Sequence, residues 1–195
     1  MSKLFLWLGF AAIAGAGGSA VYADISQRYQ SSQFDHDVAA LARTAGVDGP
    51  PAAIEAAADL KEGDRIGRLE IPRLGISVMV LQGTEEATLV AGAGHVPGTP
   101  SPGGDGNVVI AAHRDTFFRK LEGIEPGDRI RIATVRGTYE YVVDSMDTVD
   151  PDNTEAMESR GRNELTLITC FPFYYVGSAP KRFIVHASPP PAPGG

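Results

Sequence analysis

Turn-forming residues recur so often after position 64 that long helices do not fit there. The chain of 195 residues contains 23 glycines and 14 prolines, and both residue types interrupt regular helices. Between them lie short apolar runs, some with strict alternation, as in residues 129–132, where arginines alternate with isoleucines. This period of two is typical of half-buried strands. The pattern predicts about seven or eight short strands in a closed barrel or a sandwich, and excludes a helical bundle.

The expected strands can be placed from these runs. They cover Arg65–Ile71, Ile76–Gln82, Asn107–His113, a run around Ile130, a run from Tyr139 to Val143, Leu165–Cys170 and Arg182–Ala187. Residues 92–106 are rich in glycine and proline and are expected to form a loop. Within this part of the chain, helical signal is confined to short pieces near residues 85–89, 117–121 and 153–158. Before it, residues 27–45 have the weak amphipathicity of a helix, and residues 52–60 suit a short one.

Both ends of the chain differ from this central part. Residues 4–23 are an apolar run without a charge, between Lys3 and Asp24. The run is long enough to span a bilayer, and the flanking charges predict that the N-terminus lies inside. A cleaved signal peptide is the alternative, because the run ends in residues that a signal peptidase accepts. Both interpretations export the rest of the chain.

We therefore expect a single-pass protein of the cell membrane whose folded domain lies outside the cytoplasm. The predicted parts are a membrane anchor over residues 1–23, a stalk over 24–62, a folded domain over 63–188 and a disordered proline-rich tail over 189–195.

Charge and cysteine content exclude several classes of protein. The 17 basic and 24 acidic residues give a net charge of −7, so the chain lacks the basic surface that binding to nucleic acid requires. A single cysteine, Cys170, excludes an internal disulfide and a metal site built from several thiolates. Whatever role Cys170 has, it has as a thiol.

Cys170 ends an apolar strand and is followed directly by Phe171-Pro172. Strand ends beside loops commonly carry reactive groups, and a catalytic thiol needs a base or a cationic neighbour. His113 is the first candidate, because it also ends an apolar strand beside a polar loop. The alternatives are His186, which suits a barrel wall, and His95, which suits a structural hydrogen bond. A buried, inert cysteine is the competing interpretation of the thiol.

Arg182 begins the last predicted strand, after the loop that follows Cys170. If the two strands are neighbours, the loop returns the guanidinium to the thiol, where its planar donors suit a substrate carbonyl or an oxyanion. Thr169, His95 and Asp115 are further candidates for substrate binding, with strand capping as the alternative for Thr169. Residues 150–163 are the candidate wall of a peptide groove.

Three motifs resemble the sortase family. The run Thr166-Leu167-Ile168-Thr169-Cys170 matches the sortase signature T-L-x-T-C, and its continuation through residues 171–182 resembles class D sortases. Residues 113–118 resemble the segment that carries the catalytic histidine in that class, and residues 94–98 resemble a class D loop. The motifs occur in the family's order.

The resemblance covers about residues 65–187 and implies an eight-stranded β-barrel with cysteine transpeptidase activity. It implies that Cys170 is the nucleophile, His113 the general acid/base and Arg182 the group that positions substrate and stabilises the oxyanion. The implied substrate is an LPxTG-like sorting signal on another exported protein, and the implied acceptor is an amine of a peptidoglycan precursor or a pilin lysine. No metal or organic cofactor is implied. Ala112 stands where many relatives have glycine, a difference of one methyl group.

Two other functions stay open at this point. A hydrolytic cysteine peptidase would use the same pair of residues and resolve the thioester with water. A membrane-tethered envelope-binding barrel would carry an inert thiol.

Overall fold

The computed structural model of the protein describes residues 25–36, 60–175 and 177–191. After a helix over residues 25–36, the elements in chain order are β1 (Arg65–Ile71), η2 (Pro72–Leu74), β2 (Ile76–Gln82), α2 (Glu86–Ala91), β3 (Ala93–His95), β4 (Asn107–Ala111), η3 (Arg119–Gly123), β5 (Arg129–Thr134), β6 (Gly137–Val149), η4 (Glu155–Met157), β7 (Glu164–Phe171) and β8 (Lys181–Ser188).

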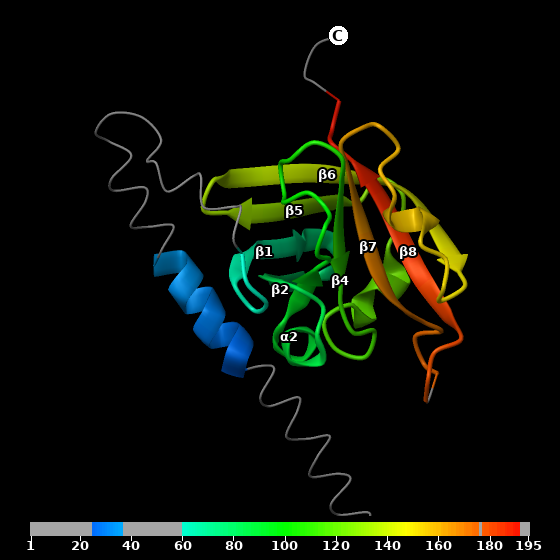
Figure 1. Ribbon diagram of the computed structural model, residues 1–195, viewed down its shortest axis with the longest axis horizontal. Coiled ribbons are helices and arrows are strands. Elements are labelled where there is room, and N and C mark those ends of the chain that lie inside the picture. Colours follow the sequence, from blue (N-terminus) through cyan, green and yellow to red (C-terminus); the bar gives the residue numbers. More distant parts are fainter. Residues whose placement is uncertain (1–24, 37–59, 176, 192–195) are drawn as a thin grey trace, which may run out of the picture.

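The strands close into one barrel in the order β1-β2-β3-β4-β7-β8-β6-β5. The pairs β2–β3 and β4–β7 are parallel, and the other neighbours are antiparallel. Figure 1 shows β4, β7 and β8 running side by side along one flank of the barrel. The sequence left open a sandwich or a barrel, and the closed barrel is confirmed.

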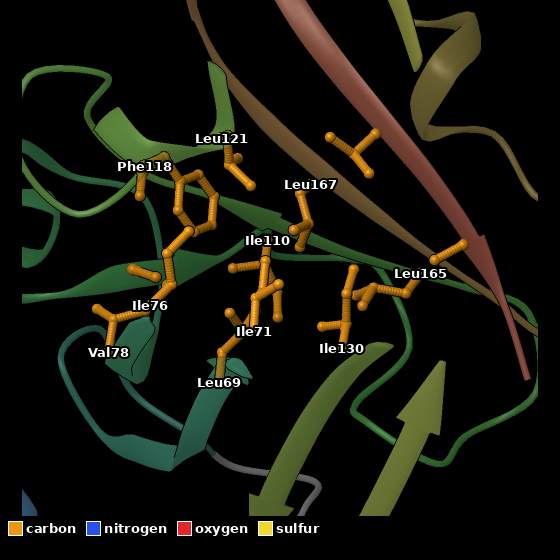
Figure 2. Close-up of a cluster of buried hydrophobic side chains, with 14 of the residues drawn as sticks. Leu69, Ile71, Ile76, Val78, Ile110, Phe118, Leu121, Ile130, Leu165 and Leu167 are labelled. Atoms are coloured by element: carbon orange, nitrogen blue, oxygen red, sulfur yellow. The ribbon is translucent and has the colours of Figure 1, made fainter. Parts of the chain in front are cut away.

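The interior of the barrel is a packed apolar core. Alternate residues of each strand point inward, among them Ile110 of β4 and both Leu165 and Leu167 of β7, all with 0% exposure. Figure 2 shows how Phe118 and Leu121, from the segment that includes η3, extend this cluster. Because side chains fill the interior, as in other small barrels, the chemistry of this fold belongs on its outer face.

One strand lies where a loop was predicted. β3 falls within residues 92–106 and pairs with β2 on one side and with β4 on the other. Three residues are too few to show an alternation, and glycines surround them, so only the two neighbouring strands make this segment extended. β4 also ends at Ala111, two residues before the predicted end at His113.

The helix over residues 25–36 packs against the barrel (blue in Figure 1). The side-chain amide of Gln27 accepts a hydrogen bond from the backbone N–H of Met79 (2.8 Å) and donates one to the carbonyl of Ala91 (2.5 Å). Phe34 is buried. Backbone groups at the edge of β2 and the end of α2 therefore find their partners on this helix.

Residues 24–62 are predicted to form a stalk, and the helix over residues 25–36 of this segment docks on the barrel. Arg68 of β1 adds an ion pair with Asp35 (2.8 Å), so the part of the stalk that the structure describes belongs to the folded unit. The predicted anchor and residues 37–59 lie outside the described residues. Among the helices that are described, none is long and apolar enough to cross a membrane.

Gly67 provides a test of how tightly β1 packs on β5. A Cβ at this position would lie 2.2 Å from the carbonyl oxygen of Ala133, which is backbone and cannot move aside. We expect Gly67→Ala to lower the free energy of unfolding by about 1–3 kcal/mol, measured by urea denaturation. Gly123→Ala is the matched control, because its Cβ would meet only Leu74 at 3.6 Å. Equal stability of the two variants would contradict this packing.

Candidate active site

The register between β7 and β8 brings two of the predicted site residues together. Cys170 lies directly opposite Arg182, a pairing that sets Cβ atoms about 5 Å apart. Three positions earlier on β7, Leu167 points into the core opposite Val185. Since side chains alternate along a strand, Cys170 and Arg182 both point to the outer face of the barrel.

His113 reaches the same place from β4. In the parallel β4–β7 pair Ala111 lies beside Ile168, so continuing two positions along both strands sets His113 beside Cys170. The chain stays close to β7 over these positions, because the backbone N–H of Ala112 donates to the carbonyl of Ile168 (3.1 Å). The outward alternation then aims the imidazole to the same face as the thiol.

These three side chains line one open cleft of about 310 Å³. Its lining residues are His113, Arg114, Asp115, Cys170, Gly177, Ser178, Ala179 and Arg182. Cys170 is a free, half-buried cysteine, and the side chain of His113 is 31% exposed. A thiol, an imidazole and a guanidinium therefore share a surface that a polypeptide can reach.

Hydrogen bonds and charges further define the cleft. Nη1 of Arg182 donates to the carbonyls of Lys181 (3.1 Å) and Ala179 (3.4 Å), which holds one side of its guanidinium against the chain. The carboxylate of Glu86, on α2, lies 3.7 Å from Nε2 of His113 and is 80% exposed. Such an exposed pair contributes at most about 1 kcal/mol.

The other predicted site residues have different positions. Asp115 is exposed and lines the cleft. Thr169 is buried, and its hydroxyl donates to the carbonyl of Ala112 (2.7 Å), which matches the strand-capping alternative. His95 is buried on β3, where Nε2 donates to the carbonyl of Pro100 (2.8 Å) and Nδ1 lies 2.9 Å from the side-chain oxygen of Gln82. Thr169 and His95 are thus outside the lining of the cleft.

His186 lies at the far end of β8 from the cleft. Its Nε2 is 3.3 Å from the guanidinium of Arg160, which belongs to the segment 150–163. The same segment is held by Asn107, whose amide donates to the carbonyl of Ala156 (3.2 Å). None of residues 150–163 lines the cleft, so their predicted role as a groove wall stays a prediction.

Sequence reasoning missed three contributions to this site. Glu86 is distant from His113 in the sequence, and no local pattern connects them. Arg114 follows His113 directly, yet its position alone does not reveal its contacts. Residues 177–179 come from the loop after β7, and only the return of the chain along β8 brings them to the cleft.

A model of the Sortase domain family matches residues 69–190. The chain belongs to the sortase family. Sortase D of Bacillus subtilis (strain 168) is 37% identical over 125 residues, which are 64% of this chain and 63% of that protein. Sortase A of Bacillus anthracis is 30% identical over 163 residues, which are 82% of this chain and 76% of that protein.

Solved structures agree with this sortase assignment at the level of the fold. The Clostridium perfringens Sortase D5 transpeptidase matches with a TM-score of 0.70 at 21% identity, over 87% of this chain and 98% of that one. The sortaseC1 of Streptococcus suis matches with a TM-score of 0.61 at 29% identity, over 66% and 74% of the two chains. The predicted sortase resemblance and the eight-stranded sortase barrel are confirmed.

The described part of this sortase contains no group of three or more His, Cys, Asp or Glu side chains placed to hold a metal ion.

Two buried histidines outside the cleft make the stability of this sortase depend on pH. Burial lowers the pKa of His95, against a smaller opposing effect of its bond to Pro100. Burial, and after it the charge of Arg160, lowers the pKa of His186. The unfolded chain therefore binds protons on these rings at higher pH than the folded chain does. We expect the free energy of unfolding to fall as the pH drops through about 6.5.

Urea denaturation at about pH 7.5 and about pH 5.5 measures this decrease. The variant His186→Gln should show a smaller difference between the two conditions. His36→Gln, at an exposed histidine of the N-terminal helix, is the control and should keep the wild-type difference. A wild-type protein that is equally stable at both pH values would contradict the expectation.

Proposed function

We propose that this sortase is a cysteine transpeptidase with Cys170 as nucleophile, His113 as general acid and base, and Arg182 as the group that binds the substrate carbonyl and its oxyanion. The observation that carries the proposal is the single cleft lined by these three side chains. Two neighbouring strand pairings, β4–β7 and β7–β8, support it independently.

The first half of the reaction forms a thioester. The thiol of Cys170 gives its proton to His113 and its sulfur attacks the carbonyl carbon of the scissile peptide bond. The resulting oxyanion accepts hydrogen bonds from Arg182, which lines the cleft. The C–N bond then breaks as His113 gives a proton to the departing amine. The acyl group stays on the sulfur, and the amine product leaves.

The second half transfers the acyl group to an amine. The incoming nitrogen attacks the thioester carbonyl, His113 accepts its proton, and the C–S bond breaks to give a new amide. His113 returns the proton to the leaving sulfur, which restores the thiol of Cys170. A thioester keeps the acyl group activated, so no nucleotide or other energy source is needed. Water in place of the amine would give hydrolysis, which is the competing outcome that product analysis detects.

The substrate class follows from the family and from the shape of the site. We propose an LPxTG-like sorting signal on another exported protein as acyl donor, and an amine of a peptidoglycan precursor or a pilin lysine as acceptor. The cleft lies beside the end of β7 and the start of β8, where an extended peptide can follow the loop backbone of residues 177–179. We also propose that residues 4–23 anchor the enzyme in the cell membrane with the barrel outside.

Trapping the acyl-enzyme tests the proposed function. The full chain is incubated with a library of LPxTG-like peptides, with and without an amine acceptor, and its mass is measured. We expect an added acyl mass on the wild type that disappears when the amine is present, and a transpeptidation product. Cys170→Ala should abolish the added mass while circular dichroism reports an unchanged fold. Turnover by Cys170→Ala would refute the nucleophile assignment.

His113, just after β4, and His186, on β8, both lie on the outer face of the barrel and can be compared in the same assay. We expect His113→Asn to lower the acylation rate by about 10² to 10⁴, whereas His186→Gln should have a mild effect because its ring lies beside Arg160, outside the cleft. The reverse ranking would exchange their roles. Hydrolysis that is unaffected by added amine would favour a peptidase.

Arg182→Lys tests whether the planar guanidinium is needed. A lysine keeps the charge but has no second donor in the same plane, so we expect kcat/KM for the sorting peptide to fall by about a hundredfold. Arg131→Lys is the control, because Arg131 lies on β5 in an exposed ion pair with Glu140 (3.2 Å), and it should retain activity. Equal activity of the two variants would reduce Arg182 to a surface residue.

A further inference from the structure

One guanidinium joins the histidine segment to the loop that walls the cleft. Nη1 of Arg114 donates to the carbonyl of Pro172 (3.0 Å), and its Nη2 donates to the carbonyls of Tyr175 (2.6 Å) and Gly177 (3.0 Å). Its guanidinium carbon also lies 5.9 Å from the centre of the Tyr175 ring. The side chain directly after His113 thus binds three carbonyls of the β7–β8 loop, here residues 172–175 and 177–180.

The two halves of this loop are held differently. The first half contains Phe173, which is buried and packs edge to face on Phe183 (5.3 Å between ring centres). The second half leads through the exposed Tyr175 to Gly177, Ser178 and Ala179, which line the cleft. Arg114 donates to the carbonyls of Tyr175 and Gly177 in this second half. These hydrogen bonds tie the backbone of the cleft wall to the residue that follows His113.

The same loop reaches Arg182. Ala179 accepts a hydrogen bond from Nη1 of Arg182 (3.4 Å), two residues after the Gly177 carbonyl that Arg114 binds. A continuous path therefore runs from the histidine segment through Arg114 and the loop backbone to the guanidinium of Arg182. The path consists of two hydrogen bonds to loop carbonyls and the backbone between Gly177 and Ala179.

We propose that Arg114 is a positioning residue of this sortase. Its hydrogen bonds hold the β7–β8 loop at the distance from His113 at which the cleft binds an extended peptide and Arg182 faces the scissile carbonyl. This inference rests on the proposed function and adds a determinant of substrate binding to it. A lysine does not reproduce this arrangement, because its three N–H donors diverge from one nitrogen, whereas Arg114 serves the three carbonyls from two nitrogens in a fixed plane.

A neighbouring arginine provides the matched control. Nη1 of Arg119 donates to the carbonyl of Phe173 (3.2 Å), and the guanidinium stacks on the exposed ring of Tyr174 (4.1 Å). Arg119 thus binds the same loop with the same kind of side chain, yet it touches only the half that Phe173 already anchors. Arg119 is also absent from the lining of the cleft.

The test compares the full-length variants Arg114→Ala, Arg114→Lys and Arg119→Ala in three measurements. Amide hydrogen exchange over residues 172–180 reports whether the loop is held. Acylation by the best LPxTG-like peptide of the library gives KM and kcat separately. Alkylation of Cys170 by iodoacetamide, which is too small to need the loop, reports on the thiol itself.

We expect both Arg114 variants to exchange faster in the loop and to lose about tenfold to a hundredfold in kcat/KM, mostly through KM, since a displacement of about 1 Å costs this much. Alkylation of Cys170 should stay within about threefold of the wild type, and Arg119→Ala should stay within about threefold in kcat/KM.

Several results would overturn the inference. They are unchanged loop exchange in Arg114→Ala, wild-type KM in Arg114→Lys, or an equal loss of peptide acylation in Arg119→Ala. If alkylation of Cys170 and acylation by the peptide fall together, Arg114 acts on the thiol or on folding and not on the loop. If the wild type forms no acyl-enzyme with any peptide, the proposed function fails, whereas the exchange measurement still decides whether Arg114 holds the loop.

Discussion

The register of three neighbouring strands is the constraint on which the site depends. β4, β7 and β8 are held in place because residues such as Leu165, Leu167 and Val185 are buried in the barrel. A slip of one residue would turn these side chains to solvent and move Cys170 and its neighbours toward the core. The apolar core thereby fixes the positions of the side chains in the polar cleft, although none of these three core residues lines the cleft.

This constraint explains why the reactive groups sit at strand ends on the outer face. The interior of the barrel is filled, and the last residues of a strand are both held by the ladder and open to the adjoining loop. The strands place the thiol, imidazole and guanidinium, while the loop after β7 closes the cleft around them. Arg114, which follows His113 directly, connects these two parts through hydrogen bonds to the carbonyls of Pro172, Tyr175 and Gly177.

Much of this arrangement was predictable. The strands and the barrel follow from alternation and from the sortase motifs, and the strand ends point to the meeting of Cys170, His113 and Arg182 in one cleft. β3 was missed because its three residues carry no periodic signal and become extended only between β2 and β4. The docked helix over residues 25–36 was interpreted as stalk, since a glutamine that bridges backbone groups does not differ in sequence from a solvated one.

The amino-acid sequence by itself determined the strand pattern, the lone thiol and the family, because these are carried by residue type and spacing along the chain. Only the tertiary structure decided that Glu86 lies beside His113, that the hydroxyl of Thr169 donates to the carbonyl of Ala112 and that Arg114 donates to carbonyls of the loop after β7. The physical reason is that every residue type offers a backbone carbonyl as acceptor, and that Glu86 and His113 are far apart in the sequence. Such partners leave no mark in the sequence and are found only when the fold brings them together.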